Sequence, residues 1–181
     1  MTSDSADGPG SAGPPGQGVP PAFPPTWVEA VAFERMQPEH LAAVLAIERV
    51  AFPSAWSAES YLREMRNPNG HYFVARLQDE VIGYAGMWVV GDEAHVSTVA
   101  VREDRRRCGL GERLMRHLIA LAVQYQAAHM TLEVRQSNLA AQALYAKLGF
   151  QATAMRPRYY GDTGEDGVVM QRSLAEGRGP T

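Results

Sequence analysis

The sequence is poor in cysteine and has no long apolar run. Cys108 is the only cysteine among 181 residues, so an internal disulfide cannot form. No apolar stretch approaches the roughly 20 residues of a membrane-spanning helix. The N-terminus lacks the basic start and apolar core of a signal peptide. These absences exclude a disulfide-stapled scaffold and predict a cytoplasmic protein without a membrane partner.

An excess of positive charge is also missing. The 17 Lys and Arg residues are outnumbered by 20 Asp and Glu residues, giving a formal net charge of -3. Such a balance leaves no broad basic field to recruit nucleic acid, so we expect no direct nucleic-acid partner. The run Arg105–Arg107 is basic only locally. No grouping of His, Cys, Asp and Glu has the spacing of a metal site, and no metal is expected.

Composition divides the chain into a domain and two tails. Residues 1–25 are dominated by Gly, Pro, Ser and Ala. Because such a segment cannot bury enough apolar surface to offset its ordering entropy, we predict a disordered tail, with a Pro-rich ligand for a partner as the alternative. Residues 175–181 are predicted to be a second, shorter flexible tail. Residues 26–174 contain the domain, and the chain's hydrophobic fraction of 45% can fill its core.

In the first half of the domain, the sequence predicts two helices among strands. Gln37 and Ser57 are placed to cap helices over residues 38–50 and 58–65. The later strands are rich in aromatic and β-branched residues, and a short polar turn between two of them is typical of a hairpin. Strands are predicted at residues 27–33, 72–77, 81–90 and 94–101.

The second half alternates helix and strand. Apolar residues recur at helical spacing and predict an amphipathic helix over residues 111–127. Asn138 caps another helix, which ends near Leu148 with Gly149 as its stop. Strands are predicted at residues 130–135, 150–155 and 168–174. The fold class is therefore α/β (α+β), a mixed sheet with helices packed on it.

A candidate anion-binding loop, Arg106-Arg107-Cys108-Gly109-Leu110-Gly111, joins a strand to a helix. Glycines let the backbone approach a ligand, a helix N-terminus offers free N–H groups, and arginines add positive charge. These properties suit a pyrophosphate. An ordinary turn with solvated arginines fits the loop equally well on its own. The P-loop lysine is absent, and Leu114 stands where a Rossmann loop has its third glycine.

A second motif covers residues 132–150. Glu133 lies on a predicted strand, and the helix capped by Asn138 follows it. Asn138, Ala141 and Tyr145 are three and seven residues apart, so they share one helix face. Ala141 is small and leaves room for a ligand along that face. Asn138 either holds the start of the helix or reaches an amide of that ligand.

The two motifs resemble those of the GNAT acetyltransferases. The loop matches the family's Q/R-x-x-G-x-G/A motif at Arg106, Gly109 and Gly111, and residues 138–150 match N-x-x-A-x-x-L-Y-x-x-x-G-F. More narrowly, the chain is similar to the RimI type, which acetylates the N-terminal alanine of small-subunit ribosomal protein eighteen. The resemblance implies a GNAT-like mixed, mostly antiparallel central sheet flanked by helices.

The resemblance also implies an activity and the residues that carry it. Acetyl-CoA is the implied co-substrate, and the N-terminus of a protein, a ribosomal protein in the RimI type, is the implied acceptor. Glu133 is the implied general base, acting through water, and Tyr145 the implied general acid that returns a proton to the CoA sulfur. The implied cofactor-binding residues are Val99, Ala100, Val101, Arg106, Arg107, Cys108, Gly109, Leu110, Gly111, Glu112 and Asn138. The implied substrate-binding residues are Trp56, Tyr159 and Tyr160.

Alternatives remain open for single residues and for the activity. Glu133 could instead be a strand residue paired with an arginine, and Tyr145 an ordinary packing residue of its helix. His95 could be a second base or only a hydrogen-bonded strand residue. Cys108 is interpreted as a small loop residue rather than a nucleophile, because no dedicated base is evident. The rival activities are acetylation of lysine or of a small amine, and binding of an acyl-CoA without catalysis.

Overall fold

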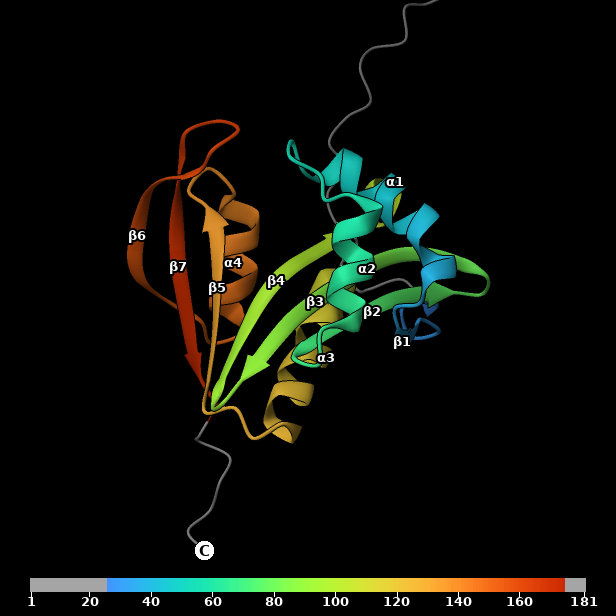
Figure 1. Cartoon of the computed structure of the whole chain (residues 1–181), viewed down its shortest axis with the longest axis horizontal. Coiled ribbons are helices and arrows are strands. Elements are labelled where there is room, and N and C mark those ends of the chain that lie inside the picture. Colours follow the sequence, from blue (N-terminus) through green and yellow to red (C-terminus); the bar gives the residue numbers. More distant parts are fainter. Residues whose placement is uncertain (1–25, 175–181) are drawn as a thin grey trace, which may run out of the picture.

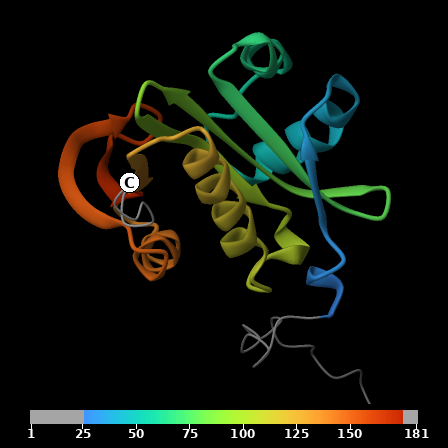
Figure 2. The same ribbon diagram turned by 90° about the horizontal axis from the view of Figure 1, so that it is seen from below.

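The computed structural model describes residues 26–174, which form a seven-stranded sheet with helices on both faces (Figures 1 and 2). The two predicted tails, residues 1–25 and 175–181, lie outside the described residues. No helix between residues 26 and 174 has both the length and the apolar character needed to cross a membrane.

The sheet is antiparallel except where β4 meets β5, and its strand order is β1-β2-β3-β4-β5-β7-β6. Its strands are β1 Ala32–Arg35, β2 Gly70–Leu77, β3 Glu80–Val90, β4 Glu93–Val101, β5 His129–Arg135, β6 Gln151–Tyr160 and β7 Glu165–Ser173. The predicted fold class, a mixed and mostly antiparallel sheet flanked by helices, is confirmed. The predicted hairpin is the β2–β3 pair.

The described residues contain four α-helices, α1 Leu41–Ala51, α2 Ala58–Arg66, α3 Leu110–Gln124 and α4 Leu139–Lys147. Two predicted caps are confirmed by hydrogen bonds. Ser57 Oγ accepts from the Ser60 N–H at 3.1 Å, and Asn138 Oδ1 accepts from the Ala141 N–H at 3.1 Å. Gly149, with φ of +86°, follows α4 as predicted.

The helices cover the two faces of the sheet unequally. In Figure 2, α1 and α2 lie on one face, and α3 and α4 lie on the other. The apolar stripe of α3, including Leu114 and Leu118, is buried against the sheet in the larger core cluster. Val44 of α1 and Tyr61 of α2 belong to a second cluster on the opposite face. Each buried side chain of this size stabilises the fold by about 1.5–3 kcal/mol.

The sheet opens between β4 and β5. These parallel neighbours pair at only three positions, from Glu93–His129 to His95–Thr131. Beyond them the two strands diverge, as Figure 1 shows, and divide the sheet into a β1–β4 part and a β5–β7 part. The larger core cluster continues across the junction, because α3 packs on β3 and β4 while Met130 and Leu132 of β5 join the same cluster.

Strands β1 and β6 depart most from their predicted bounds. Residues 26–28 form a short 3-10 turn, and β1 begins only at Ala32. The apolar character of this segment reflects packing rather than strand pairing, since Val28 is buried in the core. Strand β6 continues past the predicted end at residue 155, through register breaks on either side of Ala154–Arg156. Pro157 has no N–H to donate, which suits an edge strand.

Gly86 provides a test of the packing beneath α2. A Cβ atom at this position would clash with Cε1 of Tyr72 on the neighbouring strand. We predict that Gly86→Ala destabilises the domain by about 1–3 kcal/mol, because the Tyr72 ring must move out of a packed site. Gly161→Ala is the matched control, since its Cβ would have no heavy atom within 4 Å. Denaturant unfolding of both variants checks this, and equal midpoints would contradict it.

Candidate active site

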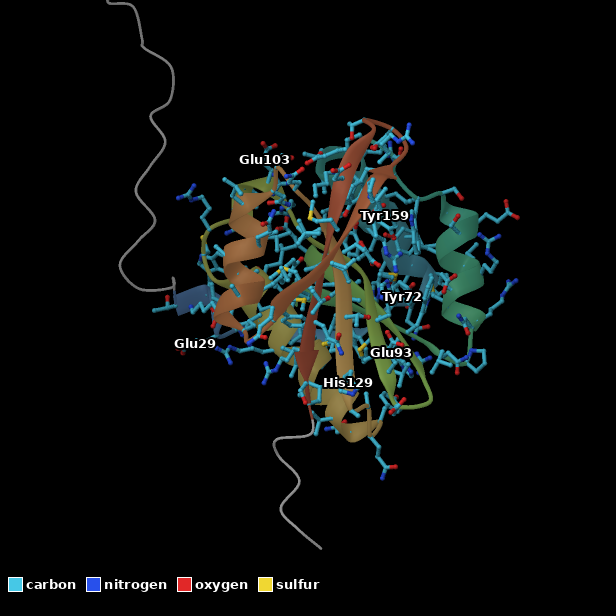
Figure 3. All side chains as sticks on the ribbon, turned by 90° about the vertical axis from the view of Figure 1, so that its left-hand side faces the viewer. Glu29, Tyr72, Glu93, Glu103, His129 and Tyr159 are labelled. Atoms are coloured by element: carbon cyan, nitrogen blue, oxygen red, sulfur yellow. The ribbon has the colours of Figure 1, made fainter. Side chains whose placement is uncertain are left out.

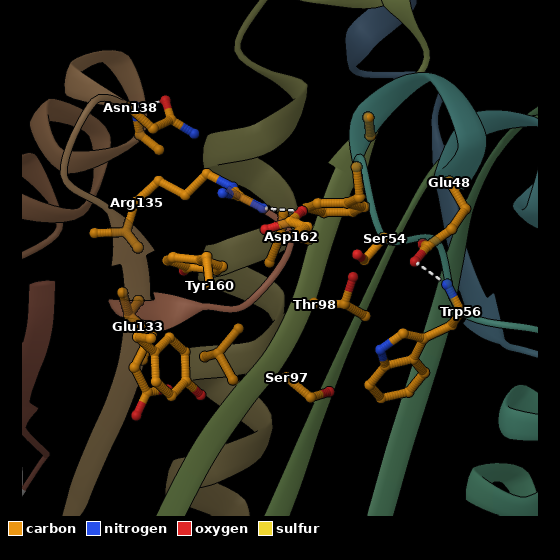
Figure 4. Close-up of a pocket in the computed structure, with 18 of the residues that line it drawn as sticks. Glu48, Ser54, Trp56, Ser97, Thr98, Glu133, Arg135, Asn138, Tyr160 and Asp162 are labelled. Carbon is orange, nitrogen blue, oxygen red and sulfur yellow. Dashed lines mark hydrogen bonds and ion pairs between the residues drawn. The ribbon is translucent and has the colours of Figure 1, made fainter. Parts of the chain in front are cut away.

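A cavity of about 690 Å³ occupies the divergence between β4 and β5. One wall is the loop between α1 and α2, and the opposite wall is β5 with the β6–β7 loop, as Figure 4 shows. The part of β4 around Thr98 lies between these walls. Seven predicted site residues line the cavity: Trp56, Val99, Glu133, Asn138, Tyr145, Tyr159 and Tyr160.

Glu133 is anchored at both carboxylate oxygens. Its Oε2 lies 3.2 Å from His95 Nε2, and its Oε1 lies 3.1 Å from Arg156 Nη1. The side chain is only 7% exposed. The alternative to a catalytic role is that Glu133 only pairs with an arginine. That pairing is present, and the same carboxylate also lines the cavity. These contacts fix the orientation of the carboxylate without placing it outside the site.

His95 extends this contact toward the start of the divergence. Its Nδ1 lies 3.1 Å from Thr131 Oγ1, and the Thr131 hydroxyl donates to Glu93 Oε1 at 3.0 Å. Because the hydroxyl proton is directed at Glu93, the Thr131 oxygen accepts from Nδ1–H of His95. Nε2, on the other side of the ring, then faces the Glu133 carboxylate. Figure 3 shows Glu93 beside His129, where β4 and β5 begin together.

Tyr145 enters the cavity from α4. Burial raises the pKa of Tyr145 to about 12, so the phenol retains its proton at neutral pH and can donate it in a hydrogen bond. Burial also raises the pKa of Tyr160 to about 12, although the positive charge of Arg135 opposes the shift. Tyr160 lines the same cavity as the two predicted catalytic groups.

The loop of residues 106–111 lies at the start of α3, outside the cavity lining. Arg107 and Gly109 have positive φ of 60° and 86°, and Gly109 is the N-cap of α3. The first N–H groups of the helix have no helical partner and point out of this end. Arg106 and Arg107 are exposed, and Arg106 Nε donates to the Val101 carbonyl at 3.0 Å. The loop combines free N–H groups with cationic side chains, and both features favour the binding of an anion.

Three predicted cofactor-binding residues have side chains committed elsewhere. Leu110 and Ala100 are 1% and 6% exposed and belong to the core. The carboxylate of Glu112 pairs with Lys147 at 2.6 Å and Arg116 at 2.8 Å, and these cations hold the pKa of Glu112 below its ordinary value. Only backbone atoms of these three residues are available to a cofactor.

Contacts between α3 and α4 connect the loop with the cavity. A Cβ atom at Gly111 would lie 3.6 Å from Cδ2 of Leu144 on α4. The ion pair of Glu112 with Lys147 also joins the two helices. The face of α4 that carries Asn138 and Tyr145 lines the cavity. A ligand with an anionic group at α3 can therefore extend along α4 into the cavity.

The free side of β4 supplies the predicted backbone donors. Val99, Ala100 and Val101 pair with β3, whereas β5 is paired with β4 only as far as His95. Because the N–H groups of successive residues point to opposite edges of a strand, only alternate residues of the three can direct an N–H into the divergence.

The two tyrosines predicted to bind substrate lie at the end of β6. The guanidinium of Arg135 stacks 4.0 Å from the ring centre of Tyr160 and pairs with Asp162 at 2.7 Å. The same guanidinium holds the pKa of the Asp162 carboxyl below its usual range. Arg135 thus ties the β6–β7 loop to β5. Tyr159 is 43% exposed at the rim of the cavity.

Sequence reasoning missed Glu48, a buried carboxylate that lines the cavity from α1. A signal for it exists, because Glu48 lies four and seven residues after Val44 and Leu41, on the apolar face of the helix. It also missed the partners of Arg135, which come from the β6–β7 loop and the first residue of β7, about 30 positions later. No local pattern indicates such pairs.

The fold and the cavity define an acetyltransferase architecture. The sequence profile of the Acetyltransferase (GNAT) family matches residues 41–150, more than half of the chain, and the chain belongs to this family. The predicted resemblance is confirmed.

Relatives of the RimI type are similar along most of their length. The [Ribosomal protein bS18]-alanine N-acetyltransferase of Escherichia coli K12 is 37% identical over 134 residues, covering 72% of this chain and 88% of the relative. The N-alpha-acetyltransferase RimI of Mycobacterium tuberculosis is 37% identical over 125 residues, covering 67% and 77%. The crystal structure of the ribosomal-protein-S18-alanine N-acetyltransferase from Escherichia coli superposes with a TM-score of 0.73 at 32% identity, covering 80% of this chain and 94% of that one.

Proposed function

We propose that the protein transfers the acetyl group of acetyl-CoA to the N-terminal α-amine of a protein, with the N-terminal alanine of ribosomal protein bS18 as the acceptor. The observation that carries this proposal is the 37% identity to the Escherichia coli enzyme of that name, over 88% of its length. The cavity between β4 and β5 supports it, because the protein has a carboxylate and a phenol there.

Acetyl-CoA is proposed to lie along α3 and α4. Its pyrophosphate is assigned to residues 106–111, where free N–H groups and exposed arginines favour an anion. Its thioester is assigned to the free side of β4 near Val99. Backbone N–H groups on that side of the strand would polarise the thioester carbonyl. Arg107, Cys108 and Gly109 belong to this proposed cofactor site, as does Asn138, whose Oδ1 already caps α4.

Gly111 tests the cofactor assignment. We predict that Gly111→Trp abolishes acetyl-CoA binding, because an indole fills the space between α3 and α4. Gly111→Ala is the control, since its Cβ would meet Leu144 only at an ordinary 3.6 Å. Calorimetry with acetyl-CoA measures both variants. Wild-type affinity for acetyl-CoA in a folded Gly111→Trp variant would show that the cofactor binds elsewhere.

In the proposed chemistry the amine nitrogen attacks the thioester carbonyl carbon, and the carbon–sulfur bond breaks. Glu133 takes the amine proton through water, and Tyr145 supplies a proton to the departing thiolate. A protein α-amine has a reference pKa of about 7.7–8.0, whereas lysine lies near 10.4, so an α-amine needs less help from a base at neutral pH. Trp56, Tyr159 and Tyr160 are proposed to contact the acceptor peptide.

The acid role predicts a specific defect in Tyr145→Phe. The ring and its packing remain, but the proton is lost, so we expect turnover to fall by about 10²–10⁴-fold. Acetyl-CoA affinity should change little, because the hydroxyl acts chiefly in the transition state. Steady-state kinetics and calorimetry separate the two effects.

Glu133→Gln is the comparison for Tyr145→Phe. A higher pH should partly restore Glu133→Gln, because it supplies more neutral amine, and should restore Tyr145→Phe only weakly. Wild-type turnover in Tyr145→Phe would indicate that water, rather than Tyr145, gives the proton to the CoA thiolate.

Thiol release with two peptides tests the proposed function against its rivals. One peptide begins with a free alanine and contains no lysine, and the other has a blocked N-terminus and one lysine. We expect CoA release with the first peptide only. Release with the second alone would indicate a lysine acetyltransferase. Acetyl-CoA binding without release for any amine would indicate a non-catalytic binding module.

A further inference from the structure

Glu48 is a buried acid without a basic partner among residues 26–174. It is 2% exposed, and no lysine, arginine or histidine of this part of the chain forms an ion pair with it. Burial raises the pKa of its carboxyl, although hydrogen bonds from Trp56 and Tyr61 oppose the shift. A buried carboxylate of this kind is costly unless its oxygens are fully hydrogen-bonded.

The two oxygens of Glu48 have different partners. Oε1 accepts the backbone N–H of Trp56 at 3.0 Å. Oε2 accepts the hydroxyl of Tyr61 at 2.7 Å, and it also accepts the hydroxyl of Tyr84. Tyr61 and Tyr84 are fully buried on α2 and β3. One oxygen therefore bonds a loop, and the other bonds the rigid core.

The loop bonded by Oε1 forms the wall of the cavity opposite Glu133. Phe52, Ser54 and Trp56 of this loop line the cavity, and Figure 4 shows the bond from Trp56 to Glu48. The loop begins with a second bond to the same residue, in which the Phe52 N–H donates to the Glu48 carbonyl at 2.9 Å. Its Pro53, Ser54 and Ala55 are exposed, so little packing fixes their path.

We propose that Glu48 is a positioning residue for the acceptor peptide: its carboxylate fixes the loop of residues 52–57 to the core and thereby sets the Trp56 wall of the peptide site. This inference rests on the proposed function for the identity of the peptide. It assigns no contact between Glu48 and the reacting atoms. The cofactor side of the cavity, at α3 and α4, is formed by other residues.

Two substitutions at Glu48 and one control separate this role from a general loss of stability. Glu48→Leu has similar volume and no acceptor, whereas Glu48→Gln retains a weaker, neutral acceptor. Tyr84→Phe is the matched control, since it removes a hydrogen bond from Oε2 and leaves the Oε1–Trp56 bond in place. Like the Glu48 variants, it disturbs the buried carboxylate.

Kinetics with an alanine-starting peptide give the first measurement. In Glu48→Leu we expect the KM for the peptide to rise about tenfold, the order expected for one charge-assisted hydrogen bond. In Glu48→Gln the rise should be smaller, and in Tyr84→Phe absent. The KM for acetyl-CoA should stay within about twofold in all three. An equal rise in both KM values, or a peptide KM that also rises in Tyr84→Phe, would overturn the proposal.

Amide hydrogen exchange of Trp56, followed by NMR, gives the second measurement and needs no substrate. Exchange at Trp56 should accelerate in both Glu48 variants and not in Tyr84→Phe. The Met36 amide, bonded to the Tyr72 carbonyl at 2.8 Å, is the internal reference and should stay protected. Unchanged Trp56 exchange and peptide KM in Glu48→Gln would overturn the proposal even if Glu48→Leu fails to fold. If the wild type turns over no alanine-starting peptide, the proposed function fails, whereas the exchange result still decides whether Glu48 holds the loop.

Discussion

The early end of pairing between β4 and β5 is the constraint on which the site depends. A continuous sheet would place β5 hydrogen bonds against β4 along its whole length and leave no cavity. Three paired positions are enough to hold the strands together at one end, and the shared core on α3 keeps the two parts joined. The unpaired edge of β4 then faces a space bounded by α1, α4 and β6. Backbone donors that would be costly in a closed core become available to a ligand.

The polar groups around this space are arranged in separate networks. Glu133 is bound to His95 and Arg156, and Arg135 is bound to Asp162 on the β6–β7 loop. Glu48 forms a third network with neutral donors only. Each network joins separate elements around the cavity, and the Glu133 network also crosses from β5 to β4. Together they fix the walls of a cavity that the backbone ladder leaves open.

Local sequence patterns predicted most of the fold but not its assembly. Caps at Ser57 and Asn138 and the stop at Gly149 were readable because each depends on a few neighbouring residues. The bounds of β1 and β6 were wrong because packing of Val28 and register breaks in β6 depend on distant partners. The motif residues were found through their resemblance to a family. The pairing of Glu133 with His95 and Arg156 required the structure, since these side chains come from three strands.

The proposed reaction is easiest with an acceptor that needs little activation by Glu133. One Glu133 oxygen faces a guanidinium and the other faces an imidazole, so the carboxylate is held in one orientation and each oxygen keeps a further lone pair for a water. Lysine, with a reference pKa near 10.4, is almost wholly protonated at neutral pH, whereas a protein α-amine at about 7.7–8.0 is partly neutral already. A carboxylate oriented in this way can position a water beside such an amine and accept its proton late in the reaction. In the proposed reaction, the lower pKa of an α-amine therefore favours such an acceptor over a lysine, on grounds independent of the names of the relatives.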